Sequence, residues 1–166
     1  MTNYDIENAP EWIEDHLDRP YWIIDIFPEQ VAPDAKGQYS AVEQYFLQEQ
    51  QIAKIRRKYL RLLLKLNCYF DILTCYDAFD QRETDPGPAE KGDLWALNPE
   101  PDSLAESIRN MKSPDSINVR IEPGDALVVL RGDDTYMTLY APGERLLDLT
   151  KQIARSEGLF VWRPKD

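Results

Sequence analysis

Apolar residues recur at helical spacing through the second half of residues 40–66, and this pattern predicts a long helix. Ser40 and Glu43 match a capping box that places its start, and the stretch 48–51 lacks apolar residues, which predicts a bend or break. Because the apolar arc is wider than that of a simple surface helix, we expect the N-terminal arm or the segment 94–97 to cover a second side. The predicted inward residues are Ile52, Ile55, Tyr59, Leu62, Leu63 and Leu66.

Short runs of β-branched and aromatic residues predict strands on both sides of this helix. Residues 21–27 and 67–77 flank it, and we expect them to form a βαβ unit with parallel strands. A second capping box, Ser103 with Glu106, predicts a short helix, and a helix is also expected between Gly143 and Gly158. The remaining strands are predicted at 117–121, 125–132, 135–142 and 159–162.

This order of elements predicts a single α+β domain over residues 1–166, with helices mainly on one face of a mixed β-sheet. Without an extra hairpin strand and a proline-rich acidic insertion, the order is similar to the ferredoxin-like βαββαβ pattern. Four parts follow one another: an acidic N-terminal arm (1–19), the βαβ unit (20–77), a proline-rich lid with the short helix (78–116), and a C-terminal part (117–166).

The formal net charge of the 166 residues is −11, and it is unevenly distributed. Residues 1–18 contain six acids and no lysine or arginine, whereas residues 54–65 contain six bases and no acid. The total counts against general nucleic-acid binding, which needs bases that neutralise phosphates. We interpret the basic side as paired with the arm, and the alternative is a site for an anion or an acidic partner. That side carries Lys54, Arg57, Lys58, Arg61 and Lys65.

Targeting signals and reactive side chains are scarce along the chain. The N-terminal residues have no basic and apolar regions like those of a secretory signal, and no apolar run nears the roughly 18 residues of a membrane span. Cys68 and Cys75 are expected to be reduced core residues of a cytoplasmic protein, on opposite faces of one strand. His16, the single histidine, is expected at the surface of the arm.

Two carboxylates, Asp25 and Asp71, interrupt strands that are otherwise fit for burial. If the strands are neighbours, repulsion between the two carboxylates would raise the pKa of one of them. The pair could then act as general acid and base, or it could hold a divalent cation. The alternative is that arginines pair with them or that this face is partly hydrated. The turn Gly132-Asp133-Asp134 is similar to the metal-binding turn of some polymerases, but we interpret it as ordinary hairpin chemistry.

These observations favour a non-enzymatic cytoplasmic module for protein interaction or regulation, which binds another protein or itself. Aromatic residues on the predicted strands, together with Trp95 as an anchor in the lid, support an interface. The alternative is a small enzyme or ligand-binding protein that uses Asp25 and Asp71 beneath the lid at 78–101. A third hypothesis is a nucleic-acid mimic that presents carboxylates to a basic partner. No cofactor, metal or membrane is expected.

Overall fold

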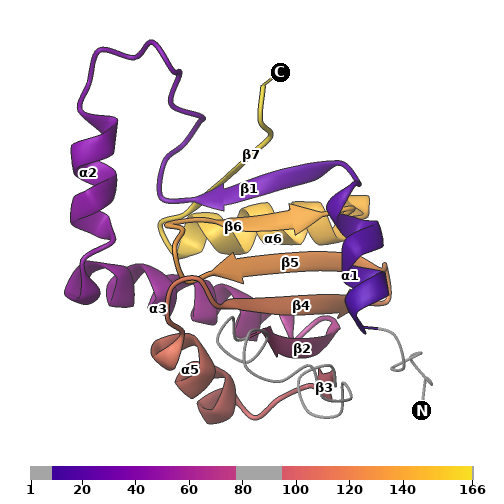
Figure 1. Cartoon of the computed structure of the whole chain (residues 1–166). Coiled ribbons are helices and arrows are strands. Elements are labelled where there is room, and N and C mark those ends of the chain that lie inside the picture. The colour runs from indigo at the N-terminus through magenta and orange to yellow at the C-terminus, as the bar shows by residue number, and fades with distance from the viewer. Residues whose placement is uncertain (1–8, 78–94, 166) are drawn as a thin grey trace.

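The computed structural model describes residues 9–77 and 95–165, which form five helices and a seven-stranded sheet (Figure 1). The helices are α1 (Ala9–Leu17), α2 (Tyr39–Phe46), α3 (Glu49–Leu66), α5 (Pro101–Asn110) and α6 (Glu144–Ser156). The strands are β1 (Tyr21–Asp25), β2 (Asp71–Asp77), β3 (Ala96–Leu97), β4 (Ser116–Glu122), β5 (Ala126–Arg131), β6 (Met137–Tyr140) and β7 (Phe160–Trp162). An α+β protein is therefore confirmed.

The sheet has the order β3-β2-β4-β5-β6-β1-β7, and every neighbouring pair is antiparallel. The prediction of a mixed sheet is therefore wrong. β1 and β2 run in the same direction, as expected for two strands joined through a helix, but β4, β5 and β6 lie between them. Short connections make β4, β5 and β6 pair in sequence order, and this three-stranded meander occupies the centre of the sheet.

The main core lies on one face of the sheet, where α3, α5 and α6 pack. Three of the five described helices thus share a face, in agreement with the sequence analysis. The six inward residues predicted for α3 are all buried. The expected second cover of α3 is wrong, because α5 and α6 flank this helix. The strands contribute Ile24, Ile72, Ile117, Val119, Ile121, Val128, Leu130, Met137 and Leu139 to this core.

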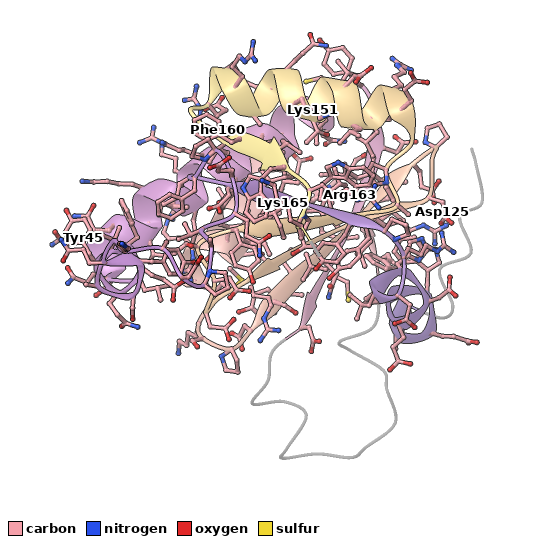
Figure 2. The ribbon with its side chains drawn as sticks, turned by 90° about the horizontal axis from the view of Figure 1, so that it is seen from above. Tyr45, Asp125, Lys151, Phe160, Arg163 and Lys165 are labelled. Carbon is pink, nitrogen blue, oxygen red and sulfur yellow. The ribbon has the colours of Figure 1, made fainter. Side chains whose placement is uncertain are left out.

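The opposite face carries α1 and a smaller apolar cluster. Trp12 and Ile13 of α1 pack against Leu73, Cys75 and Trp95. The arm therefore covers the face of the sheet that α3 does not occupy. α1 lies at one end of the molecule and α2 at the other, as Asp125 beside α1 and Tyr45 on α2 mark in Figure 2.

The helix boundaries agree only in part with the sequence signals. The predicted break is confirmed, since α2 ends at Phe46 and α3 begins at Glu49. Both capping boxes are wrong: the residues before α2 and α5 are Gln38 and Glu100, and neither makes a side-chain cap. Each predicted box has the right residue spacing, but the observed cap residues lie two and three residues before Ser40 and Ser103.

The last third of the chain follows its predicted order closely. β5 and β6 form the expected hairpin across Gly132-Asp133-Asp134. Gly143 precedes α6, and Gly158 follows it with a φ of 73°, a left-handed conformation that suits glycine.

The two cysteines differ in their surroundings. Cys75 is buried on β2, whereas Cys68 is exposed in the turn between α3 and β2. The prediction that both are core residues is wrong for Cys68, because the strand begins later than its aromatic and apolar composition suggested. Within the described residues, no helix combines the length and apolar character that spanning a bilayer requires.

Candidate functional site

The outward side of α3 carries a row of basic side chains, which we call the basic ridge: Lys54, Arg57, Lys58, Arg61 and Lys65. Burial of the opposite side of α3 sets the direction in which these side chains point. At about 1.5 Å per residue, the ridge extends about 16 Å along the helix. The sixth base, Arg56, is turned inward and donates to the carbonyl oxygens of Met111 at 2.9 Å and Gly132 at 3.1 Å.

Glu157, just after α6, pairs with the two bases at the C-terminal end of the basic ridge. Its carboxylate lies 2.5 Å from Lys65 Nζ and 2.9 Å from Arg61 Nε. The hydrogen bond from Lys65, with that from Arg61, holds the pKa of Glu157 below its usual range. The described acids of the arm do not pair with the ridge as predicted, because α1 lies on the other face of the sheet. Residues 1–8 of the arm lie outside the described residues.

The N-terminal half of the ridge has a different character. Lys54 and Arg57 are exposed and Lys58 is half-buried. In the part of the chain that the structure describes, none of these three bases forms an ion pair. Three positive charges on a rigid helix thus remain available to a negatively charged partner.

Asp25 and Asp71 do not form a common site. Side-chain alternation places both on the same face of the sheet, but β4, β5 and β6 lie between their strands. At about 4.8 Å per strand spacing, the four steps from β2 to β1 alone separate them by about 19 Å. They also lie at opposite ends of their strands, since Asp71 begins β2 and Asp25 ends β1. A site formed by both carboxylates would require β1 and β2 to be adjacent, and the central meander lies between these strands.

Asp25 is nevertheless an unusual carboxyl group. It is buried, and its Oδ1 atom accepts a hydrogen bond from the Ile26 amide at 2.7 Å. Burial raises its pKa to about 6, and repulsion from Glu43 acts in the same direction. Asp71 is more accessible and accepts a hydrogen bond from Asn98 Nδ2 at 2.9 Å.

Asp25→Asn is expected to raise the free energy of unfolding at pH 7 by about 2 kcal/mol. The folded-state pKa of about 6 lies above the ordinary aspartate value of 3.8. Between these two values the folded protein retains a proton that the unfolded chain has lost, and above pH 6 the folded protein must ionise a buried carboxyl group. The resulting stability is complete below about pH 4 and is lost as the pH rises through 6. Asparagine keeps the acceptor for Ile26 but does not ionise.

Chemical denaturation of both proteins between pH 4 and 8 measures this effect as a difference. The gain from Asp25→Asn should be small at pH 4 and reach its full value by pH 7. Asp71→Asn, at a more accessible strand carboxylate, serves as the matched control and should lack this profile. A gain that is the same at every pH would contradict the assignment to Asp25.

Trp95 and the Gly132-Asp133-Asp134 turn are accounted for by packing and ion pairs. Trp95 is buried and lies edge-on to Trp12 at 5.7 Å, so it packs against the body of the protein instead of being presented to a partner. Both aspartates of the turn face Arg131, with ion-pair distances of 3.1 Å for Asp133 and 3.7 Å for Asp134. Of the predicted lid, residues 78–94 lie outside the described residues.

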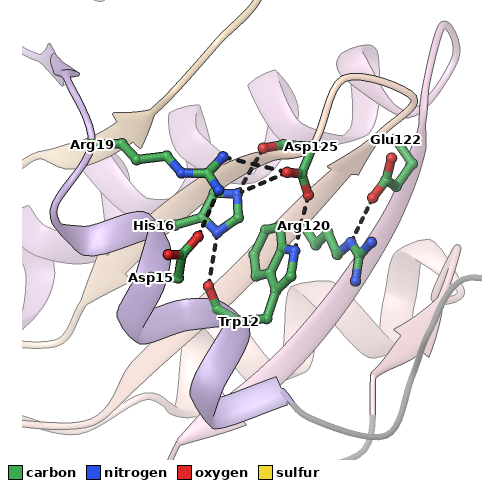
Figure 3. A network of polar contacts seen from close by, with 7 residues as sticks. All are labelled: Trp12, Asp15, His16, Arg19, Arg120, Glu122 and Asp125. Carbon is green, nitrogen blue, oxygen red and sulfur yellow. Dashed lines mark hydrogen bonds and ion pairs between the residues drawn. The ribbon is translucent and has the colours of Figure 1, made fainter.

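A polar network beneath α1 was missed by the sequence analysis (Figure 3). His16, expected at the surface, is fully buried against the β4–β5 turn. Trp12 donates from Nε1 to Asp125 Oδ1 at 2.9 Å, and Arg19 donates to Asp125 Oδ2 at 3.3 Å. The available signal was the spacing of Trp12 and His16, which places both on one side of a helix.

Arg120 connects this network to the sheet. Its guanidinium lies over the Trp12 ring, 4.6 Å from the centroid, and donates from Nε to Glu122 Oε1 at 2.6 Å. A row of polar groups therefore runs from β4 to α1 on the face opposite the basic ridge.

Comparison of the chain with protein-family models, curated proteins and solved structures gives no match.

Proposed function

We propose that this chain is a protein-interaction module and that its basic ridge binds an acidic segment of a partner protein. The observation that carries the proposal is the N-terminal half of the ridge, where Lys54, Arg57 and Lys58 have no ion pair among the described residues. Arg61 and Lys65 differ from these three bases, because both form ion pairs with Glu157.

Geometry and charge support an acidic peptide as the ligand. The ridge is about 16 Å long, which corresponds to about five residues of extended chain. The molecule carries a net charge of −11, so a polyanion is attracted only where bases are concentrated. Long nucleic acids are disfavoured for the same reason, because they would meet the acidic remainder of the surface.

The test is binding of a fluorescein-labelled decaglutamate peptide, followed by fluorescence anisotropy at low salt. We expect the triple variant Lys54→Gln, Arg57→Gln, Lys58→Gln to bind at least tenfold more weakly than the natural chain. The matched control is Arg109→Gln, Lys151→Gln, Arg155→Gln, which removes the same charge from exposed positions on α5 and α6. Its affinity should stay within threefold of the natural chain.

Three results would count against the proposal. The first is no binding of the peptide by the natural chain. The second is equal weakening in both triple variants, which would indicate only a response to net charge. The third is tighter binding of a single-stranded oligonucleotide of equal charge. Chemical denaturation of each variant accompanies the test. The free energy of unfolding of both triple variants should lie within about 0.5 kcal/mol of that of the natural chain, as is usual for surface substitutions.

The alternative of a small enzyme is not proposed. Its basis was Asp25 and Asp71 or a cleft under the lid at 78–101. The central meander separates the strands that carry the two carboxylates, and most of the lid lies outside the described residues. For the location, the cytoplasm remains our proposal, since that compartment keeps thiols such as those of Cys68 and Cys75 reduced.

For the fold, we propose a relation to the ferredoxin-like pattern. The connection β1–α3–β2 joins two strands of the same direction that are not adjacent, as in a split βαβ unit. The meander β4–β5–β6 occupies the place between them, and α6 leads on to β7 beside β1. The meander adds two strands to the βαββαβ order, rather than the one extra strand of the sequence analysis.

A further inference from the structure

We propose that α1 is a pH-sensitive latch: it docks on the sheet while His16 is doubly protonated, and it detaches as His16 loses that proton. The proposal is independent of the basic ridge, which lies on the other face. It rests on the hydrogen-bond geometry of His16 and on the charges that surround it (Figure 3).

Both ring nitrogens of His16 face backbone carbonyl oxygens. Nδ1 lies 2.7 Å from the Trp12 oxygen, and Nε2 lies 2.8 Å from the Asp125 oxygen. A carbonyl oxygen only accepts hydrogen bonds, so each contact needs an N–H on the imidazole. A neutral histidine has one N–H, whereas an imidazolium has two. In the neutral ring, one nitrogen lone pair would therefore face a carbonyl oxygen at hydrogen-bond distance.

The surrounding charges favour a cation at this position. Asp125 Oδ2 lies 3.4 Å from His16 Nε2, and the Trp12 ring stacks on the imidazole with centroids 3.6 Å apart. Among the residues that the structure describes, the ionised groups nearby are Asp15 and Arg19 from α1, Arg120 and Glu122 from β4, and Asp125 from the turn. These three carboxylates and two guanidinium groups carry a net charge of −1, which favours a cationic imidazole.

Burial makes the protonation state important for docking. The His16 side chain is 1% exposed, so water cannot replace a hydrogen bond that is lost there. A buried polar group without a partner is costly. α1 has nine residues, too few for a helix that is stable without packing. Loss of one hydrogen bond and of the ionic contact with Asp125 should therefore release α1 and uncover Leu73, Cys75 and Trp95.

The sign of the pH dependence follows from proton counting. The docked state needs the proton on His16, and the released state exposes the imidazole to water, where it exchanges protons freely. Docking therefore takes up a proton and weakens as the pH rises through the range in which imidazoles titrate.

The test uses the full chain labelled with ¹⁵N, in which His16 is the single histidine, so the imidazole spectrum has one source. At pH 6 we expect both ring nitrogens to carry protons, together with protected α1 amides and a dispersed Trp12 indole N–H signal. Between pH 6 and 9 all three signatures should be lost with a common midpoint. Hydrogen exchange, corrected for the intrinsic effect of pH, measures the protection.

Three variants make the assignment specific. His16→Gln should leave α1 weakly protected, with no pH dependence between pH 6 and 9. Asp125→Asn should weaken the protection of α1 at pH 6, since it removes the counter-charge, and asparagine tolerates the φ of 53° at this position. Glu14→Gln, at an exposed acid of α1, is the matched control and should keep the natural profile.

Three results would overturn the latch. The first is a neutral imidazole with a single N–H while the α1 amides are protected. The second is protection of α1 that stays the same between pH 6 and 9. The third is a pH-dependent loss of protection that is equal in His16→Gln.

Discussion

Tyr59→Ala is expected to lower the free energy of unfolding by about 4 kcal/mol, the largest effect that we predict for a single substitution in this chain. Tyr59 is 1% exposed and lies on the inward side of α3. Its removal leaves a cavity of aromatic size in the main core. Its hydroxyl group also donates to the Thr135 carbonyl oxygen at 2.6 Å and lies 3.3 Å from that of Ile24.

The two contributions can be measured separately by chemical denaturation. Tyr59→Phe keeps the ring and removes the hydroxyl group, and it should cost about 1–2 kcal/mol because buried carbonyl oxygens of the sheet lose their donor. Tyr69→Ala removes a ring that is 57% exposed and should change stability by about 0.5 kcal/mol or less. If Tyr59→Phe cost as much as Tyr59→Ala, the ring itself would contribute nothing, contrary to its burial.

Gly132→Ala is expected to cost about 3 kcal/mol of unfolding free energy. A Cβ atom at this position would overlap the Lys112 carbonyl oxygen and lie 2.7 Å from the Lys112 carbonyl carbon. These neighbours are backbone atoms, so they cannot move away as a flexible side chain would. The same segment is held by the Gly132 amide, which donates to the Asp115 oxygen at 2.8 Å, and by Arg56, which donates to the Gly132 oxygen.

The matched control for this substitution is Gly37→Ala. An added Cβ at Gly37 has no atom within 4 Å, so stability should change by about 0.5 kcal/mol or less. Comparison of thermal or denaturant unfolding of the two variants separates steric overlap from the general effect of replacing glycine by alanine. Similar losses in both would contradict the steric explanation.

The inward side of α3 illustrates what can be predicted from local pattern. The periodicity named six residues for this side, and all six are buried. The same holds for the β5–β6 hairpin and for the glycines that bound α6. Each of these features depends on residues close together in the chain, whose spacing determines which side chains share a face.

The residues of the basic ridge could be predicted from the sequence, but the residues with which they form ion pairs could not. Helical spacing placed Lys54, Arg57 and Arg61 on the outward side. The ion pair with Glu157 depends on how α6 packs beside α3, which no local pattern records. His16 shows the same limit, because its burial depends on a turn more than 100 residues later in the chain.

The separation of Asp25 from Asp71 has the same physical origin. Apolar and polar alternation identified both strands and the side on which each carboxylate lies, since these follow from the two-residue period of a strand. The alternation could not show which strands pair. β4, β5 and β6 pair with one another through short connections and lie between β2 and β1, so the two strands are not adjacent. Local spacing therefore sets the elements and their buried sides, whereas contacts between distant segments set the sheet order, the side that α1 covers and the charges left open on the ridge.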